Sequence, residues 1–250
     1  MKLIAKTRIK ELSNKGAIFY CSHSGGKDSQ TMYLELSRIV PASQLVVIHA
    51  HLPEVEWDST RQHIKNTIGQ TQYIEVVANK TFFGMVDHRQ MFPGPKYRQC
   101  TSDLKRGPIE KAIRADMKSK GKTLAVNCMG LRAEESKPRS KMETFKLHKS
   151  LSKAGRTVYN LLPIHDYLIE QVWQTISQNN QEPHWAYATG MTRLSCCFCI
   201  MASDNDLTVA AKENPELYRR YVLKEKELDF TLRQGKSLEE ITGITISEVK

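Results

Sequence analysis

Short apolar segments alternate along the chain with segments whose apolar residues recur at helical spacing. We expect β-strands in five apolar segments, at residues 17–21, 45–50, 73–78, 124–129 and 158–164. The spacing predicts helices between them at residues 29–39, 57–68 and 104–117. Strands that are apolar throughout and alternate with helices are typical of a parallel sheet covered on both faces. The pattern therefore predicts an α/β fold.

The alternation stops in two parts of the chain. Residues 82–107 are rich in glycine and proline, a composition that predicts a long functional loop. Residues 167–250 contain no expected strand, and helices are expected there at 167–176 and 206–233. We therefore predict an α/β domain at residues 1–166 and a helical C-terminal extension that packs on it as part of one structural unit.

The composition excludes several classes of protein. Of 250 residues, 40% are hydrophobic and 26% are charged, which argues against a mainly disordered or fibrous chain. No apolar run approaches the roughly 18 residues of a membrane span. The basic N-terminus is not followed by the apolar segment of a secretion signal. We expect a cytoplasmic protein without a membrane partner.

The net charge of +10 is concentrated in one part of the chain. Residues 87–156 hold 18 of the 37 basic residues but only 7 of the 27 acidic ones. Such a surplus favours a polyanionic partner, and we expect DNA or tRNA over a surface that is merely solvated. The basic residues nearest the expected chemistry are Lys137, Arg139, Lys141, Lys146, Lys149, Lys153 and Arg156.

A glycine-rich motif, SGGKDS at residues 24–29, stands between the first expected strand and the first expected helix. Its two glycines permit unusual backbone angles, so that successive amides can point at one anion. The helix N-terminus and Lys27 add positive charge, and the two serines can donate hydrogen bonds. The motif favours phosphate binding over a plain strand-to-helix turn, and it differs from the GxxxxGK[ST] motif of Walker-type NTPases.

A second motif, GLRAEESKPR at residues 130–139, follows the fourth expected strand. Loops at the carboxyl ends of parallel strands are where α/β sheets bind ligands. Arg132 and Arg139 have planar guanidinium groups suited to phosphate, and Glu135 can orient one of them. A solvated charged loop is an equal alternative for these residues alone.

Three of the six cysteines lie together at Cys196, Cys197 and Cys199, and Cys100 lies near Lys105. In a cytoplasmic chain such a cluster indicates metal or redox chemistry. Nearby cations are expected to lower the pKa of the Cys100 thiol. No second CxxC or HxxxH completes a zinc site. Three thiolates fit a [4Fe–4S] cluster with one open iron better, and zinc held by three thiolates and a histidine is the alternative.

Taken in order, four motifs resemble the phosphoadenosine phosphosulfate (PAPS) reductase-like branch of the PP-loop ATP pyrophosphatase superfamily. They are SGGKDS, the C…LK..P segment, the GLR..ES..R segment and the R.SC..C segment, from about residue 19 to residue 202. The resemblance implies a Rossmann-like, adenine nucleotide α-hydrolase-like sheet with helices on both faces. It also implies ATP with Mg²⁺, cleaved between the α and β phosphates with release of pyrophosphate.

The resemblance implies roles for individual residues. The expected nucleotide-binding residues are Ser24, Gly25, Gly26, Lys27, Asp28, Ser29, Gly130 and Arg132. The expected catalytic residues are Lys27, Lys105, Arg132 and Arg139. By resemblance to iron–sulfur members, such as the DNA phosphorothioation ATP pyrophosphatase subunit, Cys100, Cys196 and Cys199 hold the cluster.

Three functions compete on this basis. The first is an ATP-dependent adenylylating sulfurtransferase acting on DNA or tRNA, supplied by a sulfur donor such as a cysteine desulfurase. The second is a PAPS or adenylylsulfate reductase, which is disfavoured because those enzymes use a nucleophilic cysteine in a C-terminal tail and the last cysteine here is Cys199. If the chain is such a reductase, Cys197 or Cys100 has to replace the tail cysteine. The third is a non-catalytic nucleotide- or DNA-binding module.

Overall fold

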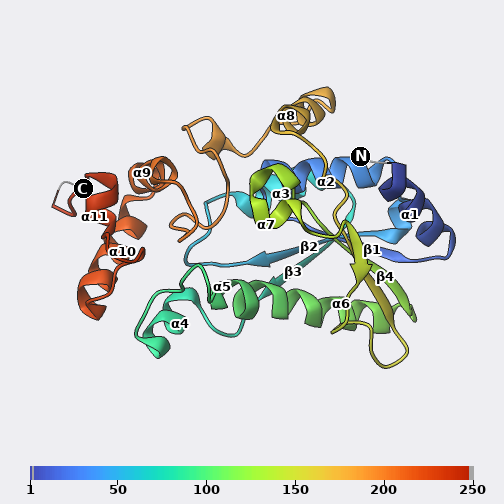
Figure 1. Cartoon of the computed structure of the whole chain (residues 1–250), viewed down its shortest axis with the longest axis horizontal. Coiled ribbons are helices and arrows are strands. Elements are labelled where there is room, and N and C mark those ends of the chain that lie inside the picture. The colour runs from blue at the N-terminus through green and yellow to red at the C-terminus, as the bar shows by residue number, and fades with distance from the viewer. Residues whose placement is uncertain (2, 248–250) are drawn as a thin grey trace. The chain divides into compact units, whose positions relative to one another are not determined.

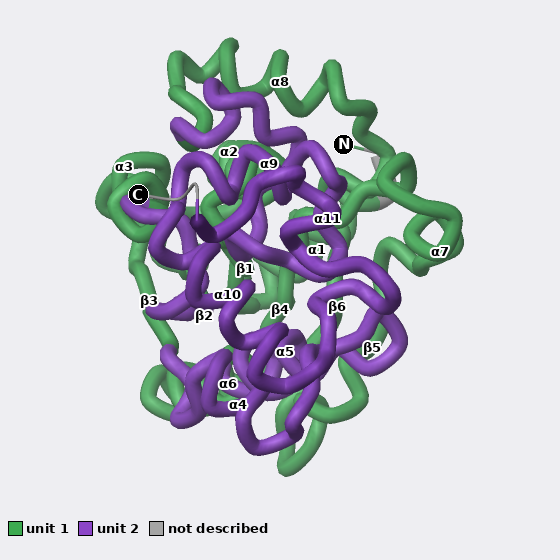
Figure 2. Tube along the Cα trace, turned by 90° about the vertical axis from the view of Figure 1, so that its left-hand side faces the viewer, with its two compact units in different colours: residues 1–49, 60–76, 109–184 green, residues 50–59, 77–108, 185–250 purple. Residues whose placement is uncertain are grey.

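The computed structural model describes residues 1 and 3–247, which form two compact units (Figure 2). Each unit has its own hydrophobic core. Unit 1 comprises Met1–His49, Thr60–Val76 and Ile109–His184, and unit 2 comprises Ala50–Ser59, Val77–Pro108 and Trp185–Lys250. The domain boundary expected at residue 166 stays a prediction.

A six-stranded sheet lies in unit 1, except for the last residues of its second and third strands (Figure 1). Its strands are β1 (Ile18–Ser22), β2 (Leu45–His51), β3 (Gln72–Val77), β4 (Leu124–Met129), β5 (Phe145–Leu147) and β6 (Thr157–Leu161). Their spatial order is β3-β2-β1-β4-β6-β5. β1 pairs in parallel with β2 and β4, β4 pairs in parallel with β6, and β5 runs antiparallel at the edge. The predicted Rossmann-like α/β fold is confirmed.

Helices cover both faces of this sheet because successive strand residues point to opposite sides. Ile18 and Tyr20 of β1 pack with Ile113 of α6 on one face, whereas Phe19 and Cys21 pack with the helices of the other face. In Figure 1, α6 lies below the sheet and α1, α2, α3 and α8 lie above it. The helices of this part are α1 (Leu3–Asn14), α2 (Lys27–Ser37), η1 (Ala42–Gln44), α3 (Thr60–Ile68), α6 (Gly107–Ser119), η3 (Ala133–Glu135), α7 (Lys137–Ser140) and α8 (Ile169–Gln178).

Unit 2 is helical, and its core is rich in aromatic residues. Its helices are α4 (Phe82–Arg89), α5 (Gln99–Thr101), the π-helical turn η2 (Ser102–Arg106), η4 (Trp185–Tyr187), α9 (Asp204–Glu213), α10 (Pro215–Leu228) and α11 (Leu238–Thr242). Phe83, Phe92, Phe198 and Tyr221 are fully or almost fully buried in this core.

The long loop predicted at residues 82–107 is wrong, because this stretch contains α4, α5 and the π-helical turn. Thr81 caps α4 by accepting a hydrogen bond from the backbone amide of Gly84 at 3.0 Å. Phe82 and Phe83 are buried in the core of unit 2, and this burial stabilises the helix despite its glycine.

Other differences from the expected elements are local. β5 and α1 were not predicted, since β5 is only three residues long and α1 has no strong amphipathic pattern. The single helix expected at 206–233 is two helices, α9 and α10, because Pro215 cannot continue a helix and starts a new one after Asn214.

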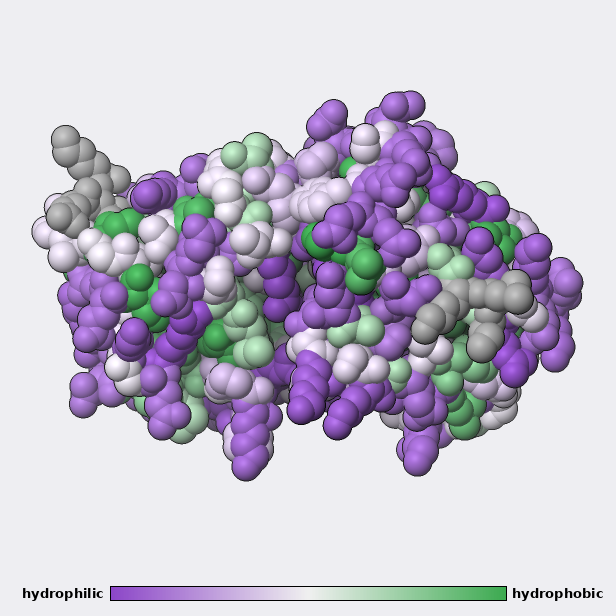
Figure 3. Space-filling view, turned by 45° about the horizontal axis from the view of Figure 1, so that its top comes forward, coloured by the Kyte–Doolittle hydropathy of each residue, from purple (hydrophilic) through white to green (hydrophobic). Residues whose placement is uncertain are grey.

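None of the helices in residues 1 and 3–247 combines the length and apolarity that crossing a membrane requires. The face drawn in Figure 3 is mostly hydrophilic, with hydrophobic residues in small separate groups. The cytoplasmic location stays a prediction.

Candidate functional site

The SGGKDS loop, residues 24–29, follows β1 at the centre of the sheet. β1 is the strand at which the spatial order reverses, because β2 lies on one side of it and β4 on the other. Ligands of α/β proteins bind outside the carboxyl ends of strands at such a switch point. The loop therefore occupies the ligand-binding position of this fold.

Ser29 holds the loop in shape. Its hydroxyl accepts a hydrogen bond from the Ser24 amide at 3.1 Å and donates one to the Gly26 carbonyl at 2.8 Å. Gly25 has a φ of +80°, a left-handed angle that favours glycine. No side chain among the described residues caps the N-terminus of α2, which begins at Lys27. The loop thus presents an uncapped helix N-terminus, where an anion is stabilised by backbone amides and the helix dipole.

His23 is a loop residue that the sequence analysis did not assign to the site. Its buried Nδ1 accepts a hydrogen bond from the Gly25 amide at 3.0 Å. Burial lowers the pKa of His23 well below its usual value, and the nearby His63 and His49 lower it further. A neutral imidazole keeps Nδ1 available as an acceptor. No sequence motif reveals this role, because it depends on the turn that brings the Gly25 amide back to the ring.

Charged side chains of the two motifs meet at Asp28. Its Oδ1 lies 2.6 Å from Nε of Arg132, and its Oδ2 lies 3.3 Å from Nζ of Lys27. Arg132 is only 4% exposed and also pairs with Glu134. The guanidinium of Arg132 therefore clamps the loop to the segment that follows β4. A direct contact between Arg132 and phosphate stays a prediction.

Gly130 lies where these two segments approach most closely. A Cβ atom on Gly130 would lie 2.8 Å from the carbonyl oxygen of Asp28 and 3.1 Å from the amide nitrogen of Ser29. Both neighbours are backbone atoms, which cannot move aside as a flexible side chain can. Gly130 was expected to bind nucleotide, and the structure gives it a packing role behind the loop.

Arg139 lies on the short helix α7. Its guanidinium pairs with Glu135, as the sequence suggested for one of the two arginines. Ser136 caps the helix by accepting a hydrogen bond from the Arg139 amide at 3.3 Å, and His165 bonds to the Arg139 carbonyl at 2.9 Å. The side chain is half-buried and held in place, but its contact with nucleotide stays a prediction.

The second group of predicted residues lies in unit 2. Cys100 is on α5, and Cys196 and Cys199 are in the turns that precede α9. All three are half-buried and pack against the core of unit 2. The π-helical turn after α5 carries Lys105, whose Nζ donates a hydrogen bond to Sγ of Cys196 at 3.4 Å. Lys105 was expected to be catalytic, near the nucleotide or substrate, and this role stays a prediction; the structure shows its amine at Cys196.

Cys197 differs from its neighbours. It is fully buried, and its backbone amide donates a hydrogen bond to the carbonyl of Val55 at 2.9 Å. Burial raises the pKa of the Cys197 thiol far above its usual value. The structure thus separates the packing cysteine of the CCFC sequence from Cys196 and Cys199.

The expected lowering of the Cys100 pKa is wrong. Burial raises the pKa of Cys100 and that of Cys196, and the opposing effect of Lys105 on each is smaller. The pKa of Lys105 is itself raised, mainly by Cys196, so the amine stays protonated. The sequence shows that cations lie near Cys100, but it does not show that the thiol is buried. Burial has the larger effect on the pKa of this thiol.

The spacing of the thiols limits what they can bind. In a tetrahedral zinc site with Zn–S bonds of about 2.3 Å, the sulfurs lie about 3.8 Å apart. No three cysteine sulfurs in the described part of the chain lie within 4.8 Å of one another. Three half-buried thiols beside a cation are a donor set that suits a thiolate-bound metal group, and the choice between an iron–sulfur cluster and zinc stays a prediction.

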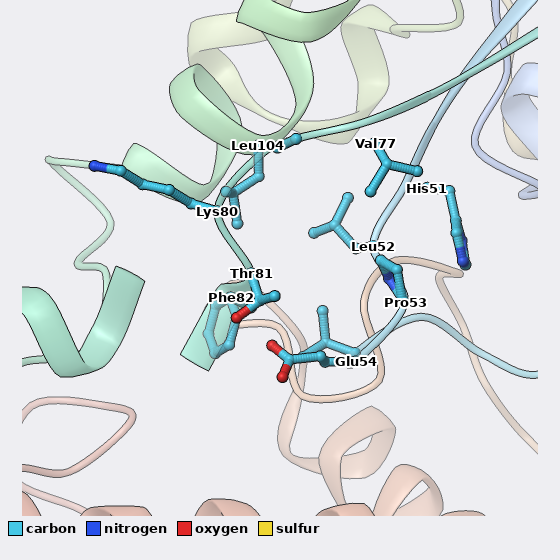
Figure 4. A pocket seen from close by; sticks show the side chains of 11 residues that line it. His51, Leu52, Pro53, Glu54, Val77, Lys80, Thr81, Phe82 and Leu104 are labelled. Carbon is cyan, nitrogen blue, oxygen red and sulfur yellow. The ribbon is translucent and has the colours of Figure 1, made fainter. Parts of the chain in front are cut away.

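A small cavity also lies in unit 2 (Figure 4). Its volume is about 40 Å³, and its labelled lining residues include Leu52, Glu54, Val77, Thr81 and Leu104. Pockets that bury drug-sized ligands have volumes of about 300–1,000 Å³. The cavity is too small for a nucleotide.

Comparison with known proteins identifies a family. Residues 18–202 match the family model described as the phosphoadenosine phosphosulfate reductase domain. No curated protein sequence matches the chain.

Similar solved structures include two kinds of protein. The phosphoadenylyl-sulfate reductase of Candida auris, in a phosphate complex, is 10% identical, with 78% of this chain and 96% of that chain covered and a TM-score of 0.49. The FMN adenylyltransferase of Candida glabrata with FAD and pyrophosphate is 14% identical, with 78% and 66% covered and a TM-score of 0.46. Its complex with ATP is 16% identical, with 77% and 60% covered and a TM-score of 0.47.

The close approach at Gly130 predicts the effect of adding one methyl group there. We expect Gly130→Ala to lower the free energy of unfolding by about 1–3 kcal/mol, because the Cβ displaces the backbone of the loop. ATP binding, measured by calorimetry, should weaken for the same reason. The control is Gly94→Ala, whose Cβ meets no atom within 4 Å and should change stability by less than about 0.5 kcal/mol. Equal effects of the two substitutions in urea unfolding would contradict the packing role of Gly130.

Proposed function

The chain belongs to the phosphoadenosine phosphosulfate reductase domain family, and on this premise we propose that it is an ATP-dependent adenylylating sulfurtransferase. The observation that carries the proposal is the SGGKDS loop, which presents an uncapped helix N-terminus at the switch point of the sheet. The loop is held there by Ser29, Arg132 and Gly130. Such a site binds the phosphates of a nucleotide.

In the first step, the loop would hold the β and γ phosphates of ATP. An oxygen of the acceptor attacks the α phosphorus, the bond from that phosphorus to the bridging oxygen breaks, and pyrophosphate leaves with the bridging oxygen. The amides at the start of α2 and the ammonium of Lys27 would stabilise the charge that grows on pyrophosphate. Arg139 would assist on the α phosphate, and Mg²⁺ bound to ATP would neutralise further charge.

In the second step, sulfur at the oxidation level of sulfide replaces the adenylylated oxygen, and AMP leaves carrying that oxygen. Cys100, Cys196 and Cys199 would hold a [4Fe–4S] cluster, which when bound supplies a position that can present sulfur to the acceptor. Lys105 would offset the negative charge of the three thiolates. The sulfur itself would come from a donor such as a cysteine desulfurase, whose enzyme-bound persulfide is reduced by two electrons from a thiol reductant to give sulfide.

The burial of Cys197 favours sulfur transfer over sulfonucleotide reduction. Reduction requires an accessible thiol that attacks the substrate sulfur. Cys197 and Cys100 were the two substitutes expected from sequence, and Cys197 is fully buried with a raised thiol pKa. If Cys196 and Cys199 serve as ligands together with Cys100, no other described cysteine outside the sheet is left for this role, because Cys21 and Cys128 are buried in β1 and β4.

Exposed lysines support a nucleic acid as the acceptor. Lys146 lies on the edge strand β5, and Lys149 and Lys153 lie in the connection from β5 to β6. All three are exposed, and none forms an ion pair with another described residue. Their charge is therefore available to neutralise phosphates of DNA or tRNA.

Adenylylation predicts an exchange reaction. Purified protein with DNA or tRNA should exchange labelled pyrophosphate into ATP, and Lys27→Ala should slow this exchange about 10²–10³-fold, as loss of one charge-stabilising group does. Ser29→Ala should also slow it, because the loop loses the bonds that shape it. The control is Lys10→Ala, an exposed lysine on α1. Absence of exchange with either acceptor would instead support a binding module.

The thiol site predicts a selective loss of metal. After anaerobic purification, the wild-type protein should contain iron and sulfide, and Cys100→Ala, Cys196→Ala and Cys199→Ala should each remove most of the iron. Cys197→Ala is the matched control and should retain it, because Cys197 packs in the core. Iron, zinc and sulfide analysis with a visible spectrum checks this, and zinc in place of iron would contradict the cluster.

The exposed lysines of β5 and of the β5–β6 connection predict the salt dependence of nucleic-acid binding. Replacing Lys146, Lys149 and Lys153 with glutamine should reduce the slope of log affinity against log salt by up to about 2.7 for duplex DNA, since each lost phosphate contact removes about 0.9. The control variant replaces three other exposed lysines, Lys6, Lys10 and Lys15, with glutamine, so that its net charge changes by the same amount as that of the test variant. Equal slopes for the two variants would contradict a specific surface. Titrations with duplex DNA and with tRNA distinguish the acceptors.

A further inference from the structure

Tyr221 of α10 carries a buried hydroxyl group without a hydrogen-bond partner. The side chain is 0% exposed, and its hydroxyl oxygen contacts no donor or acceptor in the described part of the chain. A buried polar group that is left unpaired costs free energy, and phenylalanine would fill the same space without that cost. A tyrosine here therefore points to a partner that the protein atoms do not provide.

The ring of Tyr221 is held among aromatic residues. It stacks on Phe92 at 5.9 Å between centroids and contacts Phe83 and Phe198 at 5.0 Å each. Phe198 stands between Cys197 and Cys199 in the sequence, so this packing ties the ring to the cysteine turn. The ring cannot turn its hydroxyl towards solvent without breaking these contacts.

The core that buries Tyr221 also contains Cys197, and Cys100, Cys196 and Cys199 pack against it. Burial is the main reason that the pKa of Tyr221 is raised well above its usual value. Cys196, Cys197, Cys199 and Cys100 each raise it further. A high pKa keeps the phenol protonated, so that it is a hydrogen-bond donor at neutral pH.

Tyr218 is a second buried tyrosine on the same helix. It lies three residues earlier on α10, is also 0% exposed, and contacts Phe198 at 5.8 Å. Its hydroxyl is paired, however, with the Thr242 hydroxyl at 2.8 Å and the Ile244 carbonyl at 2.5 Å. The two tyrosines thus differ in pairing and not in burial, which makes Tyr218 a matched control.

We propose that the Tyr221 hydroxyl donates a hydrogen bond to a sulfur atom of the group held by Cys100, Cys196 and Cys199. The inference rests on the thiolate-bound cluster of the proposed function. Lys105 donates to Cys196 from the π-helical turn, and Tyr221 supplies a second donor from α10. Hydrogen bonds to the sulfurs of a cluster stabilise its more reduced, more negative state and so raise its reduction potential.

The test compares Tyr221→Phe with Tyr218→Phe in metal-free and cluster-loaded protein. Metal-free Tyr221→Phe should melt at or above the wild-type temperature, because it removes an unpaired group. Cluster-loaded Tyr221→Phe should lose iron to a chelator about 10–100-fold more readily, because removing a hydrogen-bond partner of metal ligands weakens metal binding by about that factor. Its reduction potential should also become more negative. Tyr218→Phe should show the opposite pattern, with a lower melting temperature and unchanged iron retention and potential.

A second substitution tests the same bond without removing it. Difluorotyrosine at position 221 keeps the hydroxyl and makes it a stronger donor, so the reduction potential should move in the positive direction. Wild-type iron retention and potential in loaded Tyr221→Phe would overturn the inference and leave the proposed function intact. A wild-type protein that binds no iron on anaerobic loading would overturn both.

Discussion

The close packing of two backbone segments at the centre of the sheet is the constraint on which the candidate nucleotide site depends. The residue after β4, Gly130, lies against the carbonyl of Asp28, and a methyl carbon on Gly130 would lie only 2.8 Å from that oxygen. Because the segments are this close, Arg132 can reach Asp28 and bind it at 2.6 Å. The ion pair and the absent Cβ together hold the loop at the carboxyl end of β1, where the amides of α2 are available to an anion.

In unit 2 the corresponding constraint is the burial of polar groups. Placing Cys100 and Cys196 in the core raises the pKa of both thiols, which opposes the thiolate form that binds metal. Lys105 acts against this effect by placing a cation 3.4 Å from Cys196. Tyr221 adds a donor without an acceptor. A thiolate-bound group would satisfy all of these residues together, because it supplies negative charge and acceptor sulfur atoms at one place.

The basic residues of the chain differ in their burial and in their partners. Lys27 and Arg132 are buried and paired with Asp28, so they shape the loop from inside. Lys105 faces a thiol. Lysines such as Lys146 and Lys153 are exposed without ion pairs among the described residues, and only these contribute to a surface that a larger polyanion can bind. The net charge of +10 therefore did not locate the nucleotide site, and it overstates the charge available to nucleic acid.

The sequence by itself determined the α/β class, five of the six strands, the SGGKDS loop between the first strand and its helix, and the family, because hydrophobic periodicity and the SGGKDS motif are local properties of the chain. It did not reveal α4, whose stability comes from burying Phe82 and Phe83 in a core made of distant segments. Only the tertiary structure separated the buried Cys197 from Cys196 and Cys199, turned Arg132 into a clamp on Asp28 and packed Tyr221 against Phe198. Burial and pairing depend on residues far apart in the sequence, so no local pattern can report them.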